Sequence, residues 1–166
     1  MATPQYPTPA SADYNQAPPL WAPYYGAPFK DAVQRVFKKY ATFSGRASRS
    51  EYWWWALVNL IVSVILQILV SVGSVPTTDA NGYATSVPGP LAMVGFVVLA
   101  IWFLATIVPS LAVLARRLHD VNMSAWLILI ALVPFLGGIA LLVFALLAPN
   151  PQGQRFDRPT TPTYGG

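Results

Sequence analysis

Three long apolar runs dominate the pattern of hydrophobic and polar positions along the chain. They cover Tyr52–Ser74, Leu91–Leu114 and Ala125–Leu147, and none of them contains a charged residue. As helices, at about 1.5 Å per residue, they would each extend about 34–36 Å. The hydrocarbon core of a bilayer is about 30 Å thick. The pattern therefore predicts an all-α membrane protein with three transmembrane helices, over 52–74, 91–114 and 125–147.

The third run has an alternative interpretation. Pro134, Gly137 and Gly138 interrupt it near its middle, where they favour a kink. A break there would turn the segment back on itself, because each half, of about 11 residues, is too short to span a bilayer. We take three full spans as the prediction and keep the re-entrant hairpin as the alternative. In the second run, Pro109 leaves the carbonyl of Ala105 without its helical donor, and we expect Thr106 or a neighbouring helix to compensate.

The segments outside the runs complete the domain organisation. Residues 1–28 hold seven prolines, a density that no helix or strand tolerates. They are predicted to be a disordered tail, with a docking segment for an aromatic-lined groove as the alternative. Residues 29–148 form the membrane domain, and the Pro-, Thr- and Gly-rich residues 149–166 form a flexible C-terminal tail.

A short amphipathic helix is predicted over 30–41. Val33, Val36, Phe37 and Tyr40 follow a helical spacing of i, i+3, i+4 and i+7, and basic residues occupy the opposite face. Two positions remain open for it. It lies in the membrane interface with its apolar stripe in the acyl boundary, or it packs against the ends of the bundle.

Basic residues are distributed unevenly around the runs. Lys30, Arg35, Lys38, Lys39, Arg46 and Arg49 precede the first run, Arg116 and Arg117 follow the second, and the connection 75–90 has none. The positive-inside rule then places the N-terminus in the cytoplasm. The net charge of +4 therefore indicates orientation and anionic lipid head groups as partners, and not nucleic acid.

Charged residues gather where the first run begins and the second ends. Ser48 and Glu51 have capping-box spacing, which starts the first helix there. Both groups fall at the same membrane depth, so Glu51 is expected to pair with Arg116 or Arg117, and Asp120 with the arginines one turn before it. The surplus of arginine suits a lipid phosphate or a partner protein. The predicted cluster consists of Arg46, Arg49, Glu51, Arg116, Arg117, His119 and Asp120.

Polar side chains also recur every four residues within the first run. They are Asn59, Ser63, Gln67 and Ser71, which lie along one slowly turning helix face. Polar groups that face lipid are costly, so this stripe is expected to hydrogen-bond to other helices. The alternative is one wall of a solute path in an oligomer.

Enzyme chemistry has little support. His119 is the only histidine and there is no cysteine, so neither a multi-histidine metal site nor thiolate chemistry is available. A Gly-x-Ser-x-Gly nucleophile elbow is also absent from the sequence. We predict no catalytic residue, metal or cofactor, and a structural role for His119.

Two motifs carry a resemblance to a known family. The segment Phe43–Trp53 resembles the entry motif of the YhaH-like family of small bacterial inner-membrane proteins, known as domain of unknown function 805. Arg116–Asp120, followed by Ser124 and Trp126, is similar to its second motif, and the resemblance covers about residues 30–157. Of the Gly-x-Asn-Arg-Phe-Gly-like segment common in the family, only Arg155 and Phe156 are kept. The resemblance implies a location in the bacterial cytoplasmic membrane and no established activity.

These observations predict a non-enzymatic helix bundle. Its charged cytoplasmic cluster would lock the bundle and bind anionic head groups or a partner protein. The alternative is a subunit of an oligomeric transporter or channel that uses the polar stripe.

Overall fold

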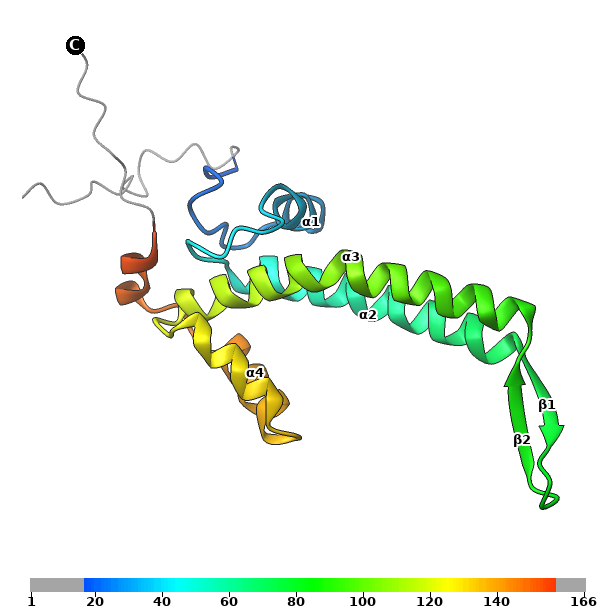
Figure 1. The fold of residues 1–166 in the computed structure, drawn as a ribbon. Coiled ribbons are helices and arrows are strands. Elements are labelled where there is room, and N and C mark those ends of the chain that lie inside the picture. The colour runs from blue at the N-terminus through cyan, green and yellow to red at the C-terminus, as the bar shows by residue number, and fades with distance from the viewer. Residues whose placement is uncertain (1–16, 158–166) are drawn as a thin grey trace, which may run out of the picture.

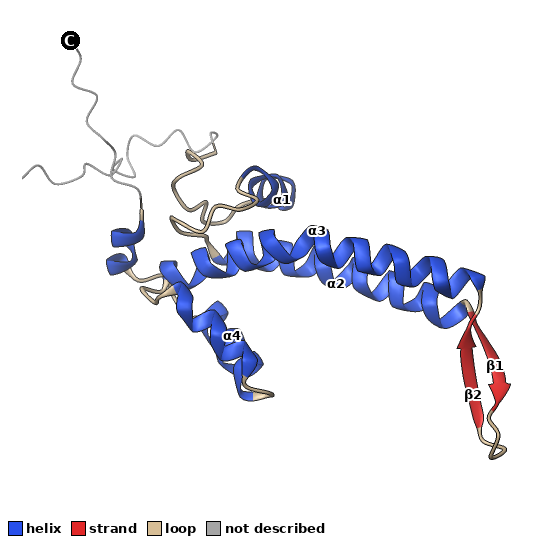
Figure 2. Ribbon diagram, viewed as in Figure 1, coloured by secondary structure: helices blue, strands red, loops and turns tan. Residues whose placement is uncertain are grey.

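Two long helices and a two-stranded hairpin form an arm, and all other elements gather at its opposite end (Figure 1). The computed structural model describes residues 17–157. Figure 2 shows that helices dominate the described chain. The elements are α1 Phe29–Lys38, α2 Arg49–Val72, β1 Ser74–Thr78, β2 Ala84–Pro88, α3 Pro90–Asp120, the 3-10 helix η1 Ala125–Leu132, α4 Leu136–Leu146 and the 3-10 helix η2 Pro151–Phe156.

Helices α2 and α3 pack as an antiparallel pair and are the two described helices long and apolar enough to cross a membrane. At about 1.5 Å per residue their 24 and 31 residues extend about 36 and 46 Å. The predicted capping box is confirmed. The Ser48 hydroxyl accepts the Glu51 amide at 3.2 Å, and the Glu51 carboxylate accepts the Ser48 amide at 2.9 Å. Helix α3 continues past the predicted end of the second span through Arg116 and Asp120.

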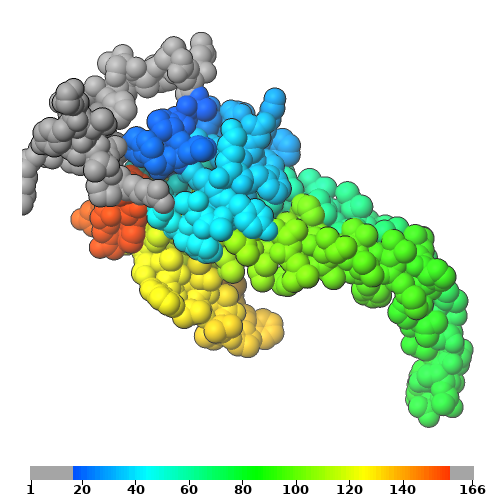
Figure 3. All heavy atoms as spheres, turned by 45° about the horizontal axis from the view of Figure 1, so that its top comes forward, coloured from blue at the N-terminus to red at the C-terminus, as the bar shows by residue number. Residues whose placement is uncertain are grey.

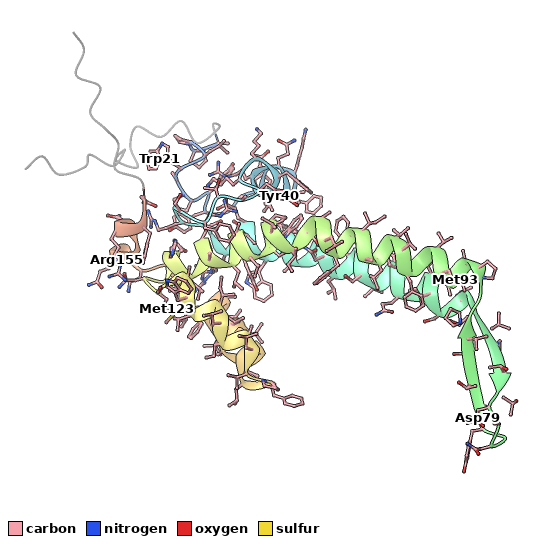
Figure 4. The ribbon with its side chains drawn as sticks, viewed as in Figure 1. Trp21, Tyr40, Asp79, Met93, Met123 and Arg155 are labelled. Carbon is pink, nitrogen blue, oxygen red and sulfur yellow. The ribbon has the colours of Figure 1, made fainter. Side chains whose placement is uncertain are left out.

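The connection between the two long helices is an antiparallel hairpin, which the sequence analysis did not predict. Ser74 pairs with Pro88 and Thr78 with Ala84. The carboxylate of Asp79 closes the turn by accepting the amides of Asn81 and Tyr83, both at 2.9 Å. The hairpin carries Asp79 to the far end of the arm (Figure 4).

The single long helix predicted over 125–147 is not found, and the segment turns back on itself as the alternative interpretation expected. The segment folds as η1 and α4, which pack against each other. Rises of about 2.0 and 1.5 Å per residue give each about 16 Å, half of a bilayer core. The carbonyl of Leu147, just after α4, accepts a hydrogen bond from Arg49 at 2.9 Å. The chain has therefore returned to the end of the arm where α2 begins.

Two residues explain why this apolar segment turns back. Pro134 has no amide donor and cannot continue a helix. Phe135 follows with a φ of 62°, a conformation that reverses the chain. Gly137 then lies against the backbone of η1, where a Cβ would overlap the Ile130 carbonyl and stand 2.7 Å from the Cα of Ala131. Hydropathy alone does not register such a close backbone approach.

Residues 17–28 correct the prediction of a disordered tail over 1–28. They form turns without regular helix or strand, and they lie against α1 and α2. The guanidinium of Arg35 holds them by donating to the carbonyls of Pro18, at 2.8 Å, and Pro19, at 3.1 Å. Residues 1–16 lie outside the described part. In the predicted C-terminal tail, 151–156 form η2, and 158–166 also lie outside it.

Helix α1 crosses the pair of long helices, and its axis lies nearly along the line of sight in Figure 1. Its buried side packs on α2, as the bundle-packing alternative expected. Val36 is buried with Ala47, Trp55 and Val113, and the ring of Phe37 meets Trp55 edge to face with centroids 5.4 Å apart. Figure 3 shows the resulting head of the molecule, from which the arm extends.

Candidate functional site

All seven residues of the predicted charged cluster lie at one end of the molecule, where α2 begins and α3 ends. The cluster's ion-pair partners from outside the predicted set are Arg35 of α1 and Asp157 after η2. We call this region the charged end. Its ionisable residues are Arg35, Lys39, Arg46, Arg49, Glu51, Arg116, Arg117, His119, Asp120 and Asp157.

Asp120 is the buried centre of the charged end. Its side chain is fully buried and accepts Arg117 at 2.6 Å, which confirms the expected pairing within one helical turn. It also accepts the Tyr25 hydroxyl at 2.7 Å and lies 3.7 Å from Arg46. Burial, reinforced by the hydrogen bond to Asp120, raises the pKa of Tyr25, so its hydroxyl stays protonated and remains a donor.

Arg117 also ties the re-entrant hairpin to α3. Its guanidinium donates to the carbonyl of Ala145 at 3.2 Å and to that of Leu147. These carbonyls end α4 and have no further helical donor. One arginine therefore satisfies a buried carboxylate and the end of a helix together.

Glu51 corrects a predicted pairing, because its partner is Arg35 and not Arg116 or Arg117. The Arg35 Nε and Glu51 Oε1 atoms are 2.8 Å apart, with both side chains almost fully buried. The other carboxylate oxygen accepts the amides of Ser48 and Tyr24. Sequence reasoning missed Arg35 because its position depends on how α1 docks.

Arg46 joins the start of α2 to the C-terminal segment. It contacts both carboxylate oxygens of Asp157, with Nη2 and Oδ2 2.8 Å apart. The backbone there approaches α3 closely, since a Cβ on Gly153 would overlap the carbonyl of His119. Two backbone bonds complete the junction, from Gly45 to Phe156 at 3.0 Å and from Asn150 to Asp120 at 2.8 Å.

His119 has structural contacts. Its Nδ1 lies 3.1 Å from the carbonyl oxygen of Gly45, and its ring stacks on Phe156 with centroids 4.1 Å apart. The guanidinium of Arg155, labelled in Figure 4, also lies over the ring of Phe156, 4.6 Å from the ring centroid. Through these contacts the His119 ring holds the C-terminal segment against α3. Among residues 17–157, no group of three possible metal ligands occurs.

Positive charge remains after the carboxylates are paired. The charged end has twice as many cations as carboxylates. The carboxylates are Glu51, Asp120 and Asp157, and the cations are Arg35, Lys39, Arg46, Arg49, Arg116 and Arg117.

Two of these cations are buried without a carboxylate within ion-pair distance in the described chain. Arg116 is 2% exposed and donates to the Ala112 carbonyl at 3.1 Å. Lys39 is 6% exposed. Burial lowers its pKa to about 8, against an opposing effect of Glu51.

The polar stripe of the first span faces a groove. Asn59, Ser63 and Gln67 line it together with α3, and its volume is about 700 Å³. Asn59 and Ser71 bond to carbonyls of their own helix, and across the part of α2 and α3 that the structure describes, no side-chain hydrogen bond joins the stripe to α3. The expected interhelical bonding comes instead from Trp55, whose indole donates to Ser110 at 3.0 Å.

Comparisons with known proteins agree with this architecture. A family model described as "Protein of unknown function (DUF805)" matches residues 40–158. The chain belongs to the DUF805 family. Inner membrane protein YhaH of Escherichia coli strain K12 is 35% identical over 126 residues, which cover 76% of this chain and 93% of the relative. Inner membrane protein YhaI of the same strain is 36% identical over 109 residues, covering 66% of this chain and 77% of the relative.

These matches confirm the resemblance that the two sequence motifs predicted. No solved structure matches the chain. The inner-membrane relatives and the two long apolar helices identify this DUF805 chain as an inner membrane protein.

Proposed function

We propose that this DUF805 protein is a non-enzymatic scaffold of the inner membrane. It crosses the bilayer with α2 and α3 and dips a hairpin of η1 and α4 into the leaflet beside the charged end. The charged end lies in the cytoplasm, in line with the positive-inside rule, and it meets anionic lipid head groups.

The observation that carries the proposal is the charge balance at the charged end. Each of the three carboxylates there is engaged by an arginine of the same chain. Three of the six cations, Arg35, Arg46 and Arg117, form these pairs. Lys39, Arg49 and Arg116 are left over. The internal network thus fixes the geometry and leaves positive charge for an external anion. Each Lys or Arg near an anionic leaflet contributes about 1 kcal/mol of attraction.

Lipid retention tests this proposal. The full-length protein would be extracted in mild detergent from vesicles of phosphatidylcholine and phosphatidylglycerol, and its bound lipid quantified. We expect phosphatidylglycerol to be enriched over its share in the vesicles, and high salt to reduce that enrichment at exposed cations. Equal retention of both lipids would refute the proposal. The excess positive charge of the charged end also suits an acidic surface on a partner protein.

A second candidate, a subunit of an oligomeric channel or transporter, is supported by the groove along α2. Gln67 and Ser63 line it, and so does Trp102, whose indole nitrogen is buried without a hydrogen-bond partner within residues 17–157. A cysteine placed at Ser63 in this cysteine-free chain distinguishes the two functions. Reaction with a water-soluble thiol reagent in native membranes would support transport, and protection would support the scaffold.

A further inference from the structure

A small pocket opens at the charged end, between the turn at residues 20–21, the C-terminal end of α1 and the loop that follows it. Its volume is about 190 Å³, several times the roughly 30 Å³ that one water occupies in the liquid. Its lining includes Leu20, Trp21, Lys38, Lys39, Thr42 and Ser44. Figure 4 labels Trp21, which lies in the segment before α1 and lines the pocket.

Lys39 gives the pocket its chemistry. The side chain is 94% buried, from its exposure of 6%, and it lines the pocket. In the described chain it forms neither a hydrogen bond nor an ion pair, while every carboxylate nearby has an arginine partner. A cation on a residue buried to this extent is unfavourable without a partner. An anion that enters the pocket would remove this deficit.

The remaining polar groups of the lining are also available donors. The side chains of Lys38, Thr42 and Ser44 have no hydrogen bond within residues 17–157, and the lining contains no carboxylate. Two ammonium groups and two hydroxyls around one cavity suit a ligand group with several acceptor oxygens. A phosphate ester has this chemistry.

The C-terminal end of α1, which borders the pocket, opposes an anion through its dipole. Its last carbonyls, however, are already satisfied. Those of Arg35 and Phe37 accept the amides of Lys39 and Tyr40, at 3.0 and 3.2 Å, and the carbonyl of Lys39 accepts the amide of Thr42 at 3.0 Å. The two lysines therefore determine the sign of the local charge.

We infer that this pocket, which we call the lysine pocket, binds the phosphate group of an anionic ligand, with Lys39 as the buried counter-ion and Lys38, Thr42 and Ser44 as further donors. Leu20 and Trp21 form an apolar edge that suits the glycerol or acyl part of a phospholipid. The inference rests on the proposed function, because it locates a specific head-group site within the charged end. A soluble phosphate ester offers the same chemistry.

The test compares Lys39→Met with Lys30→Met in the full-length protein in mild detergent. Lys30 lies in the first turn of α1 and is exposed, so Lys30→Met removes an equal charge without touching the pocket. Lys39→Met removes a buried unpaired cation, so we expect it to fold. The probes are glycerol phosphate, phosphatidylglycerol and, as the zwitterionic control, phosphatidylcholine. Binding is measured by direct titration and by the rise in unfolding temperature that a bound ligand produces.

We expect Lys39→Met to weaken binding of the phosphate probe about tenfold, as loss of one charge-assisted hydrogen bond requires. Lys30→Met should change it less than about twofold. Binding of glycerol phosphate would assign the site to soluble esters, and binding of phosphatidylglycerol alone would assign it to lipid. Equal effects of the two variants, or no binding of either anionic probe, would overturn the inference.

These results are separable from the proposed function. If wild type and Lys39→Met enrich phosphatidylglycerol equally and bind glycerol phosphate equally, the lysine pocket is refuted and the scaffold proposal stands. If wild type enriches none, the scaffold proposal fails, and Lys39-dependent binding of glycerol phosphate would still support the pocket.

Discussion

The hydroxyl of Tyr40 donates a hydrogen bond of 2.6 Å to the carbonyl of Ala105. Pro109 leaves that carbonyl without its helical donor, because proline has no amide hydrogen. From the sequence, we expect Thr106 or a neighbouring helix to compensate. Thr106 donates instead to Trp102, at 2.8 Å. The residue that compensates is therefore Tyr40, two positions after α1 ends, and the bond joins the charged end to the middle of α3.

Removal of this hydroxyl should destabilise the protein. Tyr40→Phe keeps the ring and leaves the carbonyl of Ala105 unpaired, so we expect the free energy of unfolding to fall by about 1 kcal/mol. Thermal unfolding in mild detergent measures the change. Tyr83→Phe is the control, since Tyr83 is 72% exposed in the hairpin. Equal stability of the two variants would show that Tyr40 does not stabilise α3.

The pairing of Arg35 with Glu51 is measurable as a coupling energy. Breaking a buried ion pair leaves a stranded charge, so Arg35→Met or Glu51→Gln alone should lower stability by about 3–5 kcal/mol. The double variant should lose less than the sum, because neither charge is then stranded. A cycle of Glu51 with Arg117, whose carboxylate partner is Asp120, is the control. A coupling as large in the control would contradict the assigned pairs.

The re-entrant hairpin depends on a close backbone contact at Gly137. Gly137→Ala would force its methyl group into the Ile130 carbonyl, and we expect a loss of about 1–3 kcal/mol in stability from this overpacking. Gly138→Ala is a matched control, because no atom lies within 4 Å of its added Cβ. Unfolding curves of the two variants in the same detergent provide the comparison. A neutral Gly137→Ala would refute the packing of α4 on η1.

The lowered pKa of Lys39 predicts a pH dependence with a definite sign. The group has a pKa of about 8 in the fold against an ordinary value of 10.5. The charged and titratable groups around it are Arg35 from α1, Glu51 from α2, Arg116 from α3 and Asp157 after η2. Below pH 8 the folded protein holds a buried charge, which lowers its stability. Above about 10.5 the amine is neutral in both states, and this penalty disappears.

Wild type should therefore be less stable than Lys39→Met at pH 7, and the difference should shrink as the pH rises from about 8 to 10.5. Unfolding measured in parallel across this range isolates Lys39, because Tyr25 and the other groups titrate in both proteins. A difference that is constant with pH would contradict the assignment of Lys39 as a buried cation.

The sequence predicted what depends on neighbouring residues. The capping box of Ser48 and Glu51 and the pair of Arg117 and Asp120 are three residues apart, so helical geometry alone brings them together. The two long apolar helices follow from composition and length. These local features also placed the charged cluster at one end of the molecule.

The features that were missed join distant segments. Arg35 reaches Glu51 only because α1 docks across α2, and Tyr25 reaches Asp120 across 95 positions of sequence. The prediction of a single helix over 125–147 failed because hydropathy indicates whether a segment is stable in a membrane. It does not register that the backbone reverses direction within the segment. The signal for the hairpin was Pro134 with Gly137, which the alternative interpretation had used.

The proposed topology places both ends of the described chain on the same, cytoplasmic side of the membrane. Because the chain has no cysteine, single cysteines at Ser44, Ser86 and Gln154 report their location without background. These residues are exposed before α2, in β2 and in η2. We predict that an impermeant thiol reagent applied to intact cells labels Ser86→Cys and leaves Ser44→Cys and Gln154→Cys unmodified until the membrane is opened. Labelling of Gln154→Cys from outside would require a third span and would contradict the proposed topology.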